Sequence, residues 1–243
     1  MMVLLLVGLL MLMLVLRQNI IAILFVMAAA VHLIYGDGIL LYLAEDMWTA
    51  LDKDVLLSIP LFILCGSVMT RGSISIRLVN IMRAATCSLA GGLGAAAILS
   101  CAFFAAISGS SMVTLLAVGT ILYPALREQG YSQQYSLGAI TSAGTLGVII
   151  PPSIPLIVYD ISTETPITDL FLAGLIPGLL LTVALLGYSL YHNRHQPKFP
   201  FNGREFLVVL KDGIWSLLMP VILLGGIYSG YFTATESAAV ALF

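Results

Sequence analysis

Two clusters of small and polar residues interrupt apolar stretches of the sequence, and they are its best candidates for chemistry. The first is Ser108-Gly109-Ser110-Ser111, followed by Thr114. If this cluster turns inside a membrane, its hydroxyls meet the carbonyls that end one half-helix and the amides that start the next. The carbonyl end suits a small cation and the amide end suits an anion. The alternative is that small residues only let two helices pack closely.

The second cluster combines glycines with closely spaced prolines. Its candidate site residues are Gly144, Thr145, Gly147, Pro151, Pro152 and Ser153. Proline donates no amide hydrogen bond and disfavours helix in the residue before it, so the pattern predicts a discontinuous helix. Carbonyls exposed at such a break are ligands for a hard cation. A proline kink that holds no ligand is the alternative.

Other catalytic patterns are missing from the sequence. It has no GxxxxGK[ST] or HExxH motif and no Ser/His/Asp grouping, which excludes nucleotide hydrolysis and the common hydrolases. Cys65, Cys87 and Cys101 lie in apolar surroundings without CxxC spacing, so neither a disulfide framework nor a zinc site is expected. Neither a row of intramembrane acids nor an arginine ladder appears. We therefore expect no enzyme, no organic cofactor and no transition metal.

Composition identifies the environment of these clusters. Of the 243 residues, 60% are hydrophobic and 9% are charged, whereas a soluble domain has about 45–50% and about 25%. Mean hydropathy is +1.07, which indicates an all-α polytopic membrane protein with about six to eight passes. The net charge of −2 offers no basic surface to nucleic acid.

Apolar and polar stretches then divide the chain. The expected membrane segments are 1–16, 20–35, 55–70, 89–126, 131–159, 167–191 and 213–232. Segments 36–54 and 71–87 read as amphipathic helices, the first lying in the interface with Tyr42 and Trp48 at headgroup level. Segment 192–212 reads as a polar, basic loop.

Two smaller features accompany this division. Gly174 and Gly178, four residues apart, most simply mark a helix-packing face. Glu236, just past the last span, is interpreted as an N-cap partner rather than an intramembrane acid.

The charges favour a re-entrant hairpin at 89–126, one that enters the membrane and leaves on the same side. With that hairpin, nine of the ten basic residues fall on one side and Lys53 alone on the other. Eight of the twelve acids fall on the side of Lys53: Asp37, Glu45, Asp46, Asp52, Asp54, Asp160, Glu164 and Asp169. This is the positive-inside bias, and a single crossing would reverse every later loop. Two short membrane crossings joined by a tight turn would leave the later loops on the same sides, so this alternative remains open.

Several motifs together carry a family resemblance. They are Ile59-Pro60-Leu61-Phe62-Ile63-Leu64, Met69-Thr70-Arg71-Gly72, Ala106-Ile107-Ser108-Gly109-Ser110-Ser111, GVIIPPSIPL at 147–156 with Tyr159, and LFLAGLIPG at 170–178. On these residues the chain resembles the N-terminal half of the large membrane subunit (DctM-like, M subunit) of tripartite ATP-independent periplasmic (TRAP) transporters.

The resemblance implies an elevator-type, sodium-coupled importer of organic acids such as C4-dicarboxylates or sialic acid, in the bacterial inner membrane. It implies two partners, a periplasmic solute-binding protein and a small membrane subunit of the Q type. It places sodium and substrate between the hairpin tip (Ser108, Gly109, Ser110, Ser111, Thr114) and the broken helix (Gly144, Thr145, Gly147, Pro151, Pro152, Ser153). A non-transporting scaffold subunit, or a sodium-coupled anion transporter without a binding protein, is the alternative.

The resemblance also implies a domain organisation. Residues 1–88 are scaffold spans and interfacial arm helices, and residues 89–165 are half of a transport domain, with the hairpin at 89–126 and the broken helix at 131–160. Residues 166–232 are further spans with a basic cytoplasmic loop at 193–212, and 233–243 resemble the start of a second repeat. Because members of the family are about twice as long, we expect a fragment or one part of a split subunit.

Overall fold

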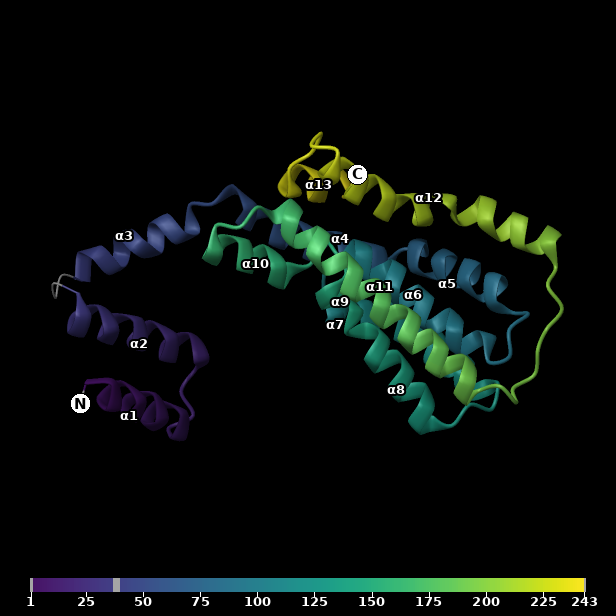
Figure 1. Ribbon diagram of the computed structural model, residues 1–243, viewed down its shortest axis with the longest axis horizontal. Coiled ribbons are helices and arrows are strands. Elements are labelled where there is room, and N and C mark those ends of the chain that lie inside the picture. The colour runs from purple at the N-terminus through teal and green to yellow at the C-terminus, as the bar shows by residue number, and fades with distance from the viewer. Residues whose placement is uncertain (1, 37–39, 243) are drawn as a thin grey trace. The chain divides into compact units, whose positions relative to one another are not determined.

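The computed structural model describes residues 2–36 and 40–242, and throughout these residues the regular secondary structure is helical (Figure 1). The predicted all-α membrane architecture is confirmed. The chain divides into two compact units, Met1–Lys53 and Asp54–Phe243. Asp37, one of the acids in the charge count, lies outside the described residues.

The first unit contains α1 (Met2–Val15), α2 (Ile20–Tyr35) and α3 (Leu40–Leu51). The side chain of Asn19 caps α2 by accepting the amide of Ile21 at 3.0 Å. The predicted amphipathic segment 36–54 forms α3, with Trp48 exposed. The ring of His32 meets Tyr42 edge-on, with centroids 6.4 Å apart, so α2 and α3 are in contact.

The second unit contains eleven helical elements among the described residues. They are η1 (Asp54–Leu57), α4 (Ser58–Arg71), α5 (Ser73–Thr86), α6 (Gly92–Ser108), α7 (Ser111–Glu128), α8 (Gln133–Gly144), α9 (Leu146–Ile149), α10 (Ile154–Thr163), α11 (Ile167–His192), α12 (Gly203–Tyr228) and α13 (Ala234–Val240). Four stretches are long and apolar enough to cross a membrane: 54–71, 133–163, 167–192 and 203–228. Neither arm of the predicted hairpin, α6 or α7, is among them.

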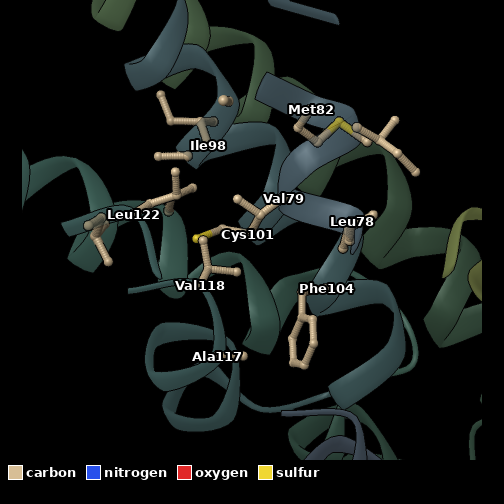
Figure 2. Close-up of a cluster of buried hydrophobic side chains, with 14 of the residues drawn as sticks. Leu78, Val79, Met82, Ile98, Cys101, Phe104, Ala117, Val118 and Leu122 are labelled. Atoms are coloured by element: carbon tan, nitrogen blue, oxygen red, sulfur yellow. The ribbon is translucent and has the colours of Figure 1, made fainter. Parts of the chain in front are cut away.

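The core of this unit lies where α5, α6 and α7 meet (Figure 2). Val79, Cys101 and Val118 come from the three different helices and gather at its centre, each fully buried. Helix α6 is apolar on all sides and rich in alanine, which is typical of a helix surrounded by others. Figure 1 shows α5 between α12 and α6, and α5 packs against both.

The prediction of a loop over 193–212 is wrong in its second half, because α12 begins at Gly203 instead of Gly213. The side chain of Asn202 caps this helix by accepting the amides of Arg204 and Glu205 at 3.2 and 3.4 Å. Among the charged residues of this first part, Phe206, Val209 and Leu210 pack against the core. The first part of α12 is therefore amphipathic, and this was not recognised in the sequence because of its charged residues.

The predicted role of Glu236 as an N-cap partner is confirmed by a capping box at the start of α13. The hydroxyl of Thr233 accepts the amide of Glu236 at 3.2 Å, and the Glu236 carboxylate accepts the amide of Thr233 at 2.8 Å. The carboxylate also accepts the Thr233 hydroxyl at 3.0 Å. These hydrogen bonds hold the pKa of Glu236 below its usual value, with the backbone amide as the largest cause.

Acid should therefore weaken this cap. Because the pKa of Glu236 is lower in the folded chain, its stabilisation is fully present above the unfolded pKa and is lost as pH falls through the folded one. We expect Glu236→Gln to melt at a lower temperature than wild type at pH 7, and the gap to close below about pH 4. Thermal unfolding across pH measures this. A gap that persists at low pH would contradict it, and Glu164→Gln, an exposed glutamate outside the cap, is the control.

Candidate functional site

The predicted turn of the hairpin lies between α6 and α7. Helix α6 ends at Ser108, and Gly109 adopts φ +60°, a left-handed conformation that favours glycine. Ser110 is extended and its carbonyl accepts the amide of Thr114 at 3.0 Å. The hydroxyls of Ser108 and Thr114, both fully buried, lie 2.8 Å apart and share a hydrogen bond across the turn.

The predicted broken helix is present, with its main break between α9 and α10. Helix α9 ends at Ile149, and the chain then passes through Pro151 and Pro152, joined by a cis peptide bond, before α10 starts. The hydroxyl of Ser153 donates to the carbonyl of Val148, so one carbonyl freed by the break is taken up locally. All three residues of the Pro-Pro-Ser turn are buried.

The two interruptions meet each other directly, as the candidate site requires. The amide of Ile154, at the start of α10, donates to the carbonyl of Gly109 at 3.2 Å. A Cβ on Gly109 would lie 2.6 Å from the carbonyl oxygen of Pro152, and one on Gly147 would lie 2.7 Å from the carbonyl oxygen of Ser110. Main-chain atoms of the hairpin tip thus contact main-chain atoms of the broken helix at both Gly109 and Gly147. We call this contact between the hairpin tip and the broken helix the junction.

Some of the predicted site residues lie apart from this contact. Thr145 is exposed, and its hydroxyl donates to the carbonyl of Ser142 at 2.7 Å, within its own helix. Ser111 is half-buried at the start of α7, and no hydrogen bond of its hydroxyl is seen. Gly144 packs on the hairpin away from the turn, where its Cβ would meet the Cβ of Leu115 at 3.1 Å.

Sequence reasoning missed one residue that packs against the junction, Gly66 of α4. A Cβ there would lie 3.1 Å from the Cβ of Ser108 and 3.0 Å from a methyl of Val113, so α4 packs directly on the tip. The only signal was a small residue in a span of larger ones. Gly174 and Gly178 do mark a packing face as predicted: their Cβ atoms would lie 2.8 Å from the carbonyl oxygen of Ile149 and 2.7 Å from the side chain of Ile150.

The junction is a closely packed set of neutral oxygen atoms. The carbonyls of Gly109 and Val148 each accept one hydrogen bond and keep a second lone pair, whereas the carbonyl of Ser110 accepts two, from the Thr114 amide at 3.0 Å and the Ser108 hydroxyl at 3.3 Å. Within the described residues no three His, Cys, Asp or Glu side chains group together. The donor set therefore fits a hard alkali cation better than a transition metal. Two clefts of the molecule, of about 530 and 390 Å³, include no junction residue.

Comparison with known proteins identifies the family. The family model described as the tripartite ATP-independent periplasmic transporter, DctM component, matches residues 1–243. The chain belongs to the DctM family. Members of this family are components of transporters and not enzymes, and this chain is a multi-pass protein of the bacterial inner membrane.

Curated members of the DctM family carry several substrate names. The C4-dicarboxylate TRAP transporter large permease protein of Pseudomonas aeruginosa is 44% identical over 202 residues, which are 82% of this chain and 47% of that protein. The isethionate permease protein DctMQ of Oleidesulfovibrio alaskensis is 40% identical over 206 residues, covering 83% and 32%. The ectoine permease protein TeaC of Halomonas elongata is 37% identical over 209 residues, covering 84% and 48%. The chain thus spans about half the length of the Pseudomonas and Halomonas proteins and about a third of the DctMQ protein.

Proposed function

We propose that this chain is part of the membrane permease subunit of a sodium-coupled secondary transporter that imports organic acids. The main support for this proposal is the geometry of the junction. Two interruptions from different parts of the sequence meet through the Ile154 amide and the Gly109 carbonyl, with backbone packed on backbone. A scaffold gains no stability from broken helices at membrane depth, because each break removes helical hydrogen bonds. A binding site for an ion does require such free carbonyls.

Sodium would be held by oxygens of the junction. The carbonyls of Gly109 and Val148 and the hydroxyls of Ser108 and Thr114 are the available ligands. Carbonyl dipoles can replace the hydration shell of an alkali cation without any formal negative charge. Among the other predicted site residues, Pro151, Pro152 and Ser153 form the break rather than supply ligands.

The partners belong to the same proposal. A periplasmic solute-binding protein would deliver the organic acid, and a small membrane subunit of the Q type would accompany the large one. The relative named DctMQ favours the second partner, because its name joins the two subunits. The names of the relatives, C4-dicarboxylate and isethionate, favour a small organic anion as substrate, and ectoine shows that the family also handles a zwitterion.

Uptake into proteoliposomes tests this proposal. The complete transporter, reconstituted with its binding protein, should accumulate a labelled C4-dicarboxylate, sialic acid or isethionate only under an inward sodium gradient. Uptake that continues after sodium is replaced by potassium would contradict sodium coupling. Uptake that needs no binding protein would favour a sodium-coupled anion transporter that works without one. If an intact assembly takes up no organic acid, a non-transporting scaffold would be favoured.

A labelling experiment tests the proposed topology. Single cysteines at Ser88, Glu128 and Lys198 should react with an impermeant thiol reagent from one face, and a cysteine at Glu164 from the other, in a background lacking Cys87. Helix α11 between Glu164 and Lys198 has 26 residues, or about 39 Å, enough to cross the bilayer. Ser88 and Glu128 flank the hairpin, so their labelling from opposite faces would overturn its re-entry.

A further inference from the structure

The larger of the two clefts lies away from the junction, at the ends of two membrane-crossing helices. It has a volume of about 530 Å³ and is lined by the end of α5, the start of α6, the segment after α7 and the start of α12. The loop between α11 and α12 contributes Pro197, Phe199 and Pro200. Because α11 ends at His192 and α12 begins at Gly203, the loop that lines the cleft joins two helices that are long and apolar enough to cross a membrane.

Two charged side chains in this cleft join no ion pair in the described parts of the chain. Arg83, half-buried in the last turn of α5, and Glu205, exposed in the first turn of α12, both line it. Within residues 2–36 and 40–242, Arg77 and Asp212 form an ion pair at 3.4 Å. Neither Arg83 nor Glu205 takes part in an ion pair there. The cleft thus presents one positive and one negative group that do not neutralise each other.

The rest of the lining mixes polar residues, among them Asn80 and Gln129, with apolar ones, and hydrogen bonds hold its walls together. Leu93, Phe206 and Val209 line the cleft beside the charged groups. The amide of Phe199 donates to the carbonyl of Cys87 at 3.1 Å, which fixes the loop on the end of α5. The hydroxyl of Thr86 donates to the carbonyl of Gly92 at 2.8 Å, which fixes the start of α6 on α5. The cleft is therefore formed before any ligand enters.

We propose that this cleft binds the headgroup of a zwitterionic aminophospholipid, with its phosphate on Arg83 and its ammonium on Glu205. The amides at the start of α6 add a favourable dipole for the phosphate. The apolar lining accepts the glycerol and the first methylenes of the acyl chains, which continue into the bilayer. A basic residue in a pocket at the end of a membrane helix is suited to a lipid phosphate, and Arg83 supplies one here. The inference is independent of the transport function proposed above.

The thiol of Cys87 offers a reporter inside the cleft. It lines the cleft and is half-buried, whereas Cys65 and Cys101 are only 1% and 0% exposed, so alkylation of the folded chain reports Cys87. The experiment measures the alkylation rate of the purified chain in detergent against added phosphatidylethanolamine. We expect saturable protection by phosphatidylethanolamine, weaker protection by phosphatidylglycerol, which lacks the ammonium group, and none by inorganic phosphate.

Matched variants test whether Arg83 binds the phosphate and Glu205 binds the ammonium group. Arg83→Gln should weaken protection by both lipids about tenfold or more, as expected for a lost charge-assisted hydrogen bond. Arg83→Lys should restore part of it, and Arg204→Gln, which removes the same charge outside the cleft, should leave it unchanged. Glu205→Gln should remove the preference for phosphatidylethanolamine over phosphatidylglycerol, while Glu128→Gln should keep it.

Two results would overturn the proposal. Equal protection in Arg83→Gln and Arg204→Gln would show that Arg83 holds no phosphate. Protection by glycerophosphoethanolamine or inorganic phosphate that matches that of the lipid would show that the occupant is a soluble phosphate compound. If Arg83→Gln does not fold, Arg83→Lys and Glu205→Gln still decide the outcome, because a selectivity that neither variant changes contradicts the proposed contacts.

Discussion

Gly147→Ala should reduce the apparent sodium affinity of uptake by the complete transporter at least tenfold. The added Cβ would lie 2.7 Å from the carbonyl oxygen of Ser110 and 2.9 Å from the amide nitrogen of Ser111. Both atoms belong to the backbone of the hairpin tip, so the tip must move. Overpacking of this kind costs about 1–3 kcal/mol, and it displaces the carbonyls that are the proposed ligands.

Two comparisons make this prediction specific. Ser110→Ala removes a half-buried hydroxyl and no backbone contact, so it should shift the sodium dependence less than Gly147→Ala. Gly187→Ala in α11 is the matched control, because its Cβ would have no atom within 4 Å. Uptake is measured against sodium concentration for each variant. If Gly147→Ala and Gly187→Ala have the same sodium dependence at normal expression, the cation site lies elsewhere.

Gly109→Ala should destabilise the folded chain by about 3 kcal/mol, roughly the sum of two separate costs. The first is the left-handed backbone, at φ +60°. The second is steric, because the Cβ would lie 2.6 Å from the carbonyl oxygen of Pro152. Relief of that clash also pulls apart the hydrogen bond between Gly109 and Ile154, at 3.2 Å. The change in free energy of unfolding is measured by denaturant titration in detergent.

Gly130→Ala isolates the first of these costs. Gly130 has φ +82°, similar in sign to Gly109, but its Cβ would have no atom within 4 Å. Its replacement should therefore cost only about 1 kcal/mol. Equal destabilisation by the two substitutions would mean that the contact between the hairpin tip and the Pro151-Pro152 turn contributes nothing to stability.

The interruptions of the helices could be predicted from the sequence because their causes are local. Pro151 and Pro152 remove amide donors wherever they lie, and the helix does break there. The turn at Gly109 follows from a small polar cluster between two apolar arms. The capping box at Thr233 and Glu236 is likewise set by residues three apart.

The individual contacts of these interruptions could not be predicted from local patterns, because they join residues that are distant in the chain; the family resemblance alone implied that the hairpin tip and the broken helix face each other. Nothing in the sequence pairs Gly66 with Ser108, or Gly147 with Ser110. The candidate site also included Thr145, whose hydroxyl turns back to its own helix. The start of α12 at Gly203 was missed because charged residues hid an amphipathic face, which only packing against the core reveals.

The hydrogen bond between Ile154 and Gly109 has a mechanical consequence. It joins the hairpin tip to the broken helix at the two places where regular helical hydrogen bonding is interrupted. The close packing of Gly147 on Ser110 also prevents the two segments from sliding past each other. A displacement of one therefore carries the other with it, as a rigid body. We therefore expect bending at the borders of this body instead, and the left-handed Glu164 that ends α10 lies at one of them.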